Sequence, residues 1–176
     1  PNVMDRYEFD LGKLSSWVDE GISPVVLNQF QVRYDPHTNS IVYPVRDADG
    51  NILVIGSRTL DPDWKTKGLR KYVYLSKWGA NTVLWGLWEN KQAIRNNKEI
   101  IVFEGAKSVM KCNTWGICNT VAALTSALNE HQLRILIGLG CNVVIAFDKG
   151  VNVWKDATVR KLRHFTNVSA IVDDCD

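Results

Sequence analysis

Two segments decide the fold: residues 99–105, "EIIVFEG", and residues 143–150, "VVIAFDKG". Each is an apolar run that ends on an acidic residue, Glu104 or Asp148, and each has a glycine one or two positions later. Near-continuous apolar runs of this length are typical of strands buried on both faces of a parallel sheet. We therefore predict two buried strands that each end on a carboxylate.

The rest of the second half alternates strand-like and helical patterns around these two runs. Asn129 is the expected N-cap of a helix, with Gln132 as its capping-box partner and Gly140 at its end. The other expected elements are strands over residues 116–120 and 168–172 and helices over residues 106–113 and 153–165. This alternation predicts a parallel sheet with helices on both faces.

The first half has a mixed pattern. Ser23, followed by a proline, predicts the start of a helix. Two strand-like runs, residues 41–46 and 52–57, are joined by a short loop that ends on glycine, which predicts a β-hairpin. Residues 85–96 suit an amphipathic helix, and the seam between the two halves is expected near Asn97.

The composition excludes several classes of protein. The chain has 176 residues, 45% hydrophobic and 23% charged, with a formal net charge of +2. These values are typical of a soluble globular protein, and no apolar run has the length of a membrane span. Because the net charge is only +2, any affinity for nucleic acid would depend on local clusters of basic residues. The four cysteines form no C-x-x-C pair, which favours reduced thiols in a cytoplasmic protein, and both ends resemble cuts in a longer chain.

The two acids form the first candidate site. In open α/β sheets, ligands bind outside the carboxyl ends of the strands, so Glu104 and Asp148 are expected at the same rim. Carboxylates brought together repel each other unless a proton or a cation separates them. Hard oxygen ligands with positions left for water and phosphate suit Mg²⁺ or Mn²⁺. The alternative is that each acid only caps the helix that follows it, where the dipole favours negative charge.

Linked motifs add a family resemblance. "VFEGAKSVM", "ALTSALNEHQLRIL" and "VVIAFDKG" resemble a Toprim domain, the metal-binding module of bacterial primases, topoisomerases and some nucleases. "GISPVVLNQFQVRY", "IVYPVRDADGNILVIGSRTL", "RKYVYLS" and "LWGLWE" resemble the catalytic core of DnaG-type primases. The resemblance implies an α/β protein. A basic subdomain of mixed α+β structure (residues 1–97) would precede a Toprim-like, largely parallel sheet flanked by helices (residues 98–176).

The resemblance also implies a function. DNA primases are nucleotidyltransferases that make RNA primers on single-stranded DNA from ribonucleoside triphosphates during DNA replication. Glu104 and Asp148 match the family's catalytic Glu-Gly and Asp-x-Asp acids, which implies bound Mg²⁺ or Mn²⁺. Asp173 and Asp174 match a third acidic cluster and complete the implied metal ligands. Contact with a replicative helicase would lie in regions outside this chain.

Two acids of the family pattern are replaced. The acid shortly after Glu-Gly is Ser108 here, and the second Asp of Asp-x-Asp is Gly150. A family motif with two acids replaced suits a primase of a phage or mobile element. It also leaves two alternatives to primase activity open. One is a Toprim fold that has lost catalysis and binds single-stranded DNA. The other is a Toprim nuclease, which shares the acids but does not explain the primase-like first half.

Basic residues form the second candidate site. Arg46, Arg58 and Lys71 match positions that resemble the template- or nucleotide-binding face of primases, and Lys67 and Arg70 add positive charge nearby. Cations of this kind neutralise phosphates. The alternative for a basic run is a solvated surface, which applies above all to Lys67. An arginine beside apolar strand residues, in contrast, must find a partner.

Overall fold

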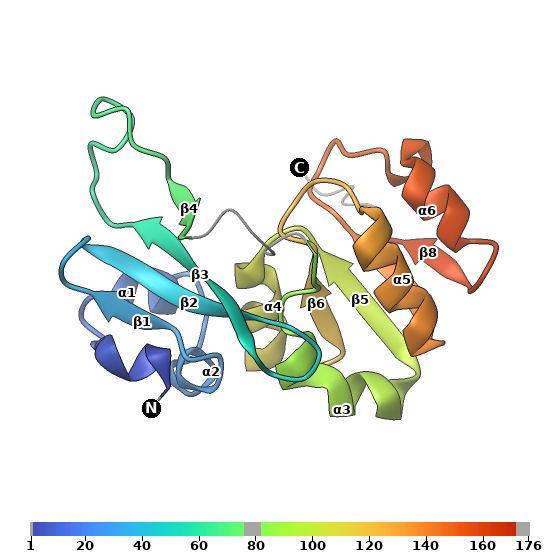
Figure 1. Cartoon of the computed structure of the whole chain (residues 1–176), viewed down its shortest axis with the longest axis horizontal. Helices are drawn as coiled ribbons and strands as arrows, with labels where there is room; N and C mark the ends of the chain where they lie inside the picture. The colour runs from blue at the N-terminus through green and yellow to red at the C-terminus, as the bar shows by residue number, and fades with distance from the viewer. Residues whose placement is uncertain (1, 76–81, 172–176) are drawn as a thin grey trace.

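The structure is a computed structural model that describes residues 2–75 and 82–171. It contains two four-stranded sheets, one in each half of the chain, which lie side by side in Figure 1. The first is antiparallel and the second is parallel, so the α/β class and the mixed first half are confirmed. None of the helices in the described part of the chain is long and apolar enough to cross a bilayer.

The first sheet has the strand order β1-β2-β3-β4. Its strands are β1 (Arg33–Asp35), β2 (Ser40–Arg46), β3 (Ile52–Thr59) and β4 (Tyr72–Tyr74), and its helices are η1 (Val3–Arg6), α1 (Ser15–Asp19) and α2 (Pro24–Gln29). The predicted hairpin is β2–β3. The predicted helix start is also confirmed, because the Ser23 hydroxyl accepts a hydrogen bond from the Val26 N–H at 3.2 Å.

The second sheet has the strand order β6-β5-β7-β8, with all three pairings parallel. Its elements are α3 (Leu87–Asn97), β5 (Glu99–Phe103), α4 (Ala106–Thr114), β6 (Thr120–Ala122), α5 (Glu130–Leu139), β7 (Asn142–Ala146), η2 (Val153–Lys155), α6 (Ala157–Leu162) and β8 (Val168–Ala170). In Figure 1, α4 lies on the side that faces the first sheet and α5 and α6 lie on the other side. Asn129, Gln132 and Gly140 cap α5 as predicted.

Two boundaries differ from the sequence prediction because a glycine or a tertiary contact overrides helical or strand propensity. The helix expected from residue 85 begins at Leu87: the Trp85 backbone pairs with Ala122 through bonds of 2.8 and 2.9 Å, and Gly86 adopts a φ of +86°. The strand expected over residues 116–120 begins only at Thr120. Gly116 has a φ of +81° and helps to end α4.

The helix expected over residues 153–165 is interrupted. Asp156 has an extended backbone (φ −68°, ψ 119°), and its carboxylate accepts the N–H groups of Thr158 and Val159 at the start of α6. Asp156 also accepts the Leu128 N–H at 3.1 Å. A carboxylate at an N-cap satisfies helix donors that otherwise lack partners, so the segment folds as η2 followed by a short α6.

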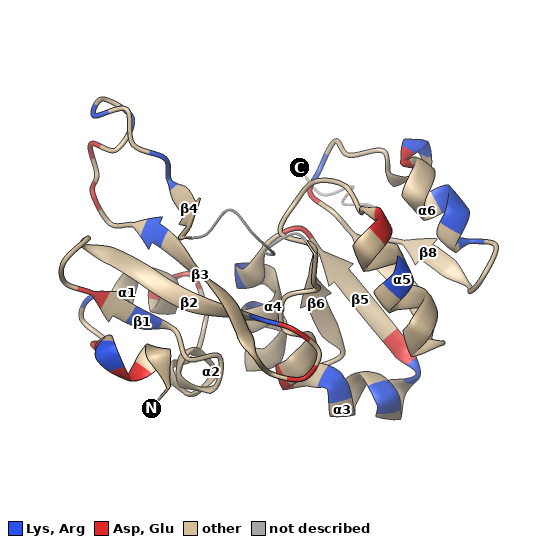
Figure 2. Ribbon diagram, in the orientation of Figure 1, with Lys and Arg blue, Asp and Glu red and all other residues tan. Residues whose placement is uncertain are grey.

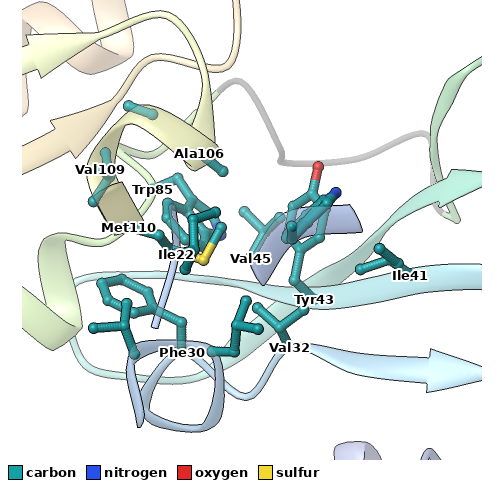
Figure 3. Packing of buried hydrophobic residues seen from close by; sticks show 14 of the residues in the cluster. Ile22, Phe30, Val32, Ile41, Tyr43, Val45, Trp85, Ala106, Val109 and Met110 are labelled. Carbon is teal, nitrogen blue, oxygen red and sulfur yellow. The ribbon is translucent and has the colours of Figure 1, made fainter. Parts of the chain in front are cut away.

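One hydrophobic cluster joins the two halves. Figure 3 shows Phe30, Tyr43, Val45 and Trp85, all from residues 1–97, packed near Val109 and Met110 from the second half. The ring centroids of Phe30 and Trp85 are 4.9 Å apart, and the indole N–H of Trp85 donates to the Pro44 carbonyl at 2.9 Å. The division of the chain at Asn97 stays a prediction. Helix α3, which ends at that residue, packs through Leu87 and Ile94 with the core of the second sheet.

Candidate active site

Glu104 and Asp148 meet at the carboxyl edge of the second sheet. They follow β5 and β7, which are adjacent and parallel with Phe103 opposite Ala146. The backbone N–H of Asp148 donates to Glu104 Oε1 at 3.0 Å. The structure therefore brings the two acids together as the sequence predicted. Neither carboxylate caps the helix that follows it among the described residues, because the N-cap of α4 is Gly105 and the N-cap of η2 is Asn152.

Both acids line a cavity of about 410 Å³. Four aromatic residues of the first half form one part of its wall: Trp17, Tyr43, Tyr72 and Tyr74. The other part comes from the second half, where Lys107 and Ser108 at the start of α4 and the loop after β6 accompany Glu104 and Asp148. The cavity therefore exists only because the two sheets are packed together, with acids on one side and aromatic rings on the other.

The aromatic wall depends on a glycine. Tyr43 lies opposite Gly56 on β3, and Gly56 lies opposite Tyr74 on β4. A Cβ atom on Gly56 would come within 2.5 Å of the Tyr43 ring, so only glycine leaves room for that ring. The pKa of Tyr43 is raised well above its usual value, and the pKa of Tyr74 is also raised. Burial is the main cause in both cases. Both phenols therefore stay protonated at neutral pH.

The donor set of this cavity fits a hard divalent cation. No lysine or arginine in the described part of the chain forms an ion pair with Glu104 or Asp148. Two carboxylates at one edge of a sheet repel each other unless a proton or a cation separates them, so Glu104 and Asp148 could hold a cation such as Mg²⁺ or Mn²⁺. Residues 2–75 and 82–171 contain no cluster of three potential metal ligands. Asp173 and Asp174, the other predicted ligands, lie outside the described residues.

Arg58 lies beside the aromatic wall. It is opposite Tyr72 on β4 and Ile41 on β2. Because residues two apart on a strand point to the same face, Arg58 shares the face of Gly56, over which Tyr43 lies. Its Nη1 donates to the Thr59 carbonyl at 3.2 Å, while its Nε is buried with no hydrogen-bond partner among the described residues. Arg58 is therefore next to the cavity and retains unused donor capacity.

Arg46 has a different environment. Its guanidinium donates to the Gly50 carbonyl at 2.7 Å, bonds to the side chain of Gln31, and forms an ion pair with Glu89 on α3 at 3.4 Å. The side chains of Arg46 and Glu89 are only 14% and 10% exposed. Arg46 does not line the cavity; it links the β2–β3 hairpin to α3. Its predicted contact with template or nucleotide stays a prediction.

We expect Arg46→Ala to lower the free energy of unfolding by ~2 kcal/mol, because it leaves the largely buried Glu89 carboxylate without its cation. Burial already raises the pKa of Glu89, which Arg46 partly offsets. Urea unfolding at pH 7 measures the effect. The matched variant Arg46→Ala with Glu89→Gln removes the stranded charge and should recover part of the loss. An unchanged midpoint for Arg46→Ala would contradict this role.

The remaining predicted basic residues lie on the connection between β3 and β4. This loop projects away from the body of the molecule in Figure 1, and Figure 2 shows both basic and acidic residues along it. Lys67 pairs with Asp61 at 2.6 Å. Arg70 and Lys71 are exposed, and Lys71 immediately precedes Tyr72 of the cavity wall. None of the three lines the cavity itself.

Lys107 and Trp17 are among the cavity residues that sequence reasoning missed. Lys107 belongs to "EGAKS", which lacks the spacing of a phosphate loop. Its position in the first turn after a strand that ends on Glu104 was the available signal, since that turn starts at the ligand-binding edge. Trp17 had no such signal, because only the packing of α1 brings it to the cavity.

No protein-family model matches the chain. A DNA primase from Halalkalibacterium halodurans is 32% identical over 133 residues, covering 73% of this chain and 21% of that protein. The Aquifex aeolicus primase structure, with zinc-binding and RNA polymerase domains, superposes with a TM-score of 0.79 and 22% identity over 99% of this chain and 54% of that one. The chain is therefore similar in sequence to part of a DNA primase, and it shares the fold of a primase structure.

Two further comparisons are with a prophage protein and with a primase domain bound to DNA. A prophage-derived uncharacterised protein, YorJ of Bacillus subtilis, is 34% identical over 143 residues, covering 76% of this chain and 38% of YorJ. A DnaG primase catalytic domain bound to single-stranded DNA has a TM-score of 0.73 and 16% identity, covering 99% of this chain and 69% of that one. The chain thus spans about a fifth to two fifths of the length of these curated relatives.

Proposed function

We propose that the protein synthesises RNA primers on single-stranded DNA during DNA replication, by nucleotidyl transfer at the Glu104–Asp148 edge. The observation that carries the proposal is the contact between these two acids at one cavity that both halves of a primase-like fold enclose. Similarity to named DNA primases supports the reaction, and similarity to a primase domain bound to single-stranded DNA supports the template. Ribonucleoside triphosphates would be the substrates, in the cytoplasm.

Acidic, aromatic and basic residues would have different roles in this reaction. Glu104 and Asp148 would hold Mg²⁺ or Mn²⁺ at the carboxyl edge of a Toprim-like sheet. When bound, such an ion offsets the negative charge of a triphosphate. The aromatic wall offers flat rings on which a base can stack, with Tyr72 the most exposed of the residues named there. Arg58, Arg70 and Lys71 supply cations for template phosphates, while Lys67 already has an acidic partner.

The second candidate is a degenerate core that binds single-stranded DNA without catalysis. Ser108 and Gly150 favour it, because two acids of the family pattern are lost there. The structure adds that Ser108 lines the cavity and that Gly150 has a φ of +89°, a backbone conformation that disfavours an acidic side chain. Likeness to a prophage protein makes a phage or mobile-element source part of the proposal.

Primer synthesis itself separates the candidates. The protein is incubated with single-stranded DNA and labelled ribonucleotides in Mg²⁺ or Mn²⁺, and the products are resolved by length. Short template-dependent RNA is the expected result. Template binding without product, also in the full-length protein, would support the non-catalytic module. Cleavage of labelled DNA in place of synthesis would support a Toprim nuclease.

We expect Arg58→Ala to weaken binding of single-stranded DNA by ~10-fold and to flatten its salt dependence, since each lost phosphate contact lowers the slope by about 0.7 for a single strand. Fluorescence anisotropy with a labelled oligonucleotide at several salt concentrations measures both quantities. Arg134→Ala on α5, away from the cavity, is the control. Equal affinity and slope for wild type and Arg58→Ala would remove Arg58 from the site.

A further inference from the structure

A cluster of cations surrounds a single carboxylate beside the cavity. Lys107 and Lys111 lie one turn apart on α4, and both reach Glu20 Oε2, with Nζ distances of 2.5 and 3.9 Å. Glu20 is the C-cap residue of α1, so the cluster bridges the two halves of the molecule. In Figure 2 the basic residues of α4 lie on the side toward the first sheet. Glu20 therefore pairs with two lysines that lie almost half the chain length away in the sequence.

The cluster has more positive than negative charge. Arg58 also acts on Glu20: burial raises the pKa of that carboxyl, but the hydrogen bond from Lys107 and the charges of Lys107, Lys111 and Arg58 outweigh burial and hold the pKa below its usual value. Glu20 is therefore ionised at neutral pH. One negative charge against three positive charges leaves an excess that attracts anions.

The cluster is continuous with the candidate active site. Lys107 lines the same cavity as Glu104 and Asp148, only three residues after Glu104 in the chain. The side chains of Lys107, Lys111 and Glu20 are 28%, 34% and 38% exposed, so a ligand can reach them. The two acids of the cavity attract a cation and repel a phosphate, which makes a neighbouring positive group necessary wherever a phosphate is to bind there.

We propose that Lys107 and Lys111, with Arg58 nearby, form a phosphate subsite next to the Glu104–Asp148 edge, and that Glu20 occupies this subsite when no phosphate is bound. The ligand is a phosphate group of a nucleotide, either the triphosphate of a free nucleotide or a phosphodiester of a strand. This inference rests on the proposed function, which it deepens by adding residues that contact the substrate.

A phosphate can replace the Glu20 carboxylate as the partner of the lysines. Lys107 donates a charge-assisted hydrogen bond to the Glu20 carboxylate, and a phosphate oxygen accepts the same bond at similar length. Glu20 keeps the two flexible lysines gathered at one point, which reduces the side-chain entropy lost when phosphate binds. Because Glu20 also competes with phosphate, it lowers the affinity of the subsite. Removal of its charge should therefore strengthen phosphate binding.

The test measures binding in EDTA, so that no metal site contributes. One arm uses ATP and the other a labelled oligothymidylate, each titrated into the folded protein at low salt. We expect Glu20→Gln to bind at least one of the two ~3–10-fold more tightly, and Lys107→Gln and Lys111→Gln to bind the same ligand ~3–10-fold more weakly. A response to ATP alone identifies the triphosphate, and a response to the oligonucleotide alone identifies the strand.

A second lysine–glutamate pair provides the matched control. Lys161 on α6 and Glu130 on α5 are 2.9 Å apart and more exposed, at 52% and 56%, and neither lines the cavity. Glu130→Gln and Lys161→Gln should leave both affinities unchanged. Weaker or unchanged binding by folded Glu20→Gln would overturn the proposal, because the proposal requires Glu20 to compete with phosphate for the two lysines.

Folding and function are separated within the same experiment. Thermal unfolding of each variant identifies any loss of the fold, and Lys111→Gln, whose contact to Glu20 is the longer one, keeps the test valid if Lys107→Gln unfolds. Primer synthesis by wild-type protein is measured independently. If affinity rises in Glu20→Gln and falls in the lysine variants but wild-type protein makes no primers, the phosphate subsite is retained and catalysis is rejected. If wild-type protein makes primers but the variants show no such changes in affinity, only the subsite is rejected.

Discussion

Glu104→Gln is expected to reduce primer synthesis at least ~100-fold, equivalent to about 2.7 kcal/mol of transition-state stabilisation. Glutamine keeps the size of the side chain and can still accept the Asp148 N–H through its carbonyl oxygen. It removes the negative charge, however, and the predicted donor set has only two described carboxylates. With so few ligands, the loss of one should abolish most cation binding and with it most of the reaction.

Asp148→Asn should have an effect of similar size, because the two carboxylates are expected to hold one cation together. Glu130→Gln on α5 is the control for the removal of a surface charge. Thermal unfolding of all three variants must match wild type, and single-stranded DNA binding should persist in Glu104→Gln and Asp148→Asn. Undiminished primer synthesis by either active-site variant, with normal folding, would contradict the proposed site.

Trp85→Ala is expected to lower the free energy of unfolding by ~4 kcal/mol, the largest stability effect that we predict. The Trp85 side chain is 2% exposed, stacks on Phe30, and lies edge-on to Tyr43 at 5.9 Å. Its indole N–H also satisfies the Pro44 carbonyl. Removal of the ring leaves a cavity at the junction of the two halves and an unsatisfied carbonyl oxygen.

Trp85→Phe isolates the hydrogen bond from most of the packing and should cost about 1–2 kcal/mol. Chemical denaturation monitored by far-UV circular dichroism measures both variants, which avoids dependence on tryptophan fluorescence. Because the cavity takes its wall from both halves, Trp85→Ala should also weaken template binding. Loss of less than ~1 kcal/mol in Trp85→Ala would show that the two halves are joined chiefly by other contacts.

The sequence predicted the second half of the fold well because its signals are local. Apolar runs gave strands β5 and β7, and Asn129, Gln132 and Gly140 gave both ends of α5, since caps are set by residues within one helical turn. The boundaries that failed depend on distant partners. Trp85 has an aromatic side chain in a helical pattern, but its backbone pairs with Ala122, which no local pattern reveals.

The placement of the acids shows how far such signals reach. Glu104 and Asp148 each follow a buried parallel strand, and the carboxyl ends of parallel strands lie at one edge. Their meeting could therefore be predicted from the sequence. The roles of the basic residues could not, because charge alone does not show its partners. Arg46 and Arg58 looked equivalent in the sequence, yet Arg46 binds Glu89 within the fold whereas Arg58 lies beside the cavity.

By itself, the sequence determined the α/β alternation and the edge at which Glu104 and Asp148 lie, because hydrophobic period and helix caps act between neighbours in the chain. Only the tertiary structure decided what faces those acids. The aromatic wall and the contact of Lys107 with Glu20, 87 residues away, arise when two sheets pack against each other. That packing depends on the fit of side chains from distant segments, and no local pattern specifies such a fit.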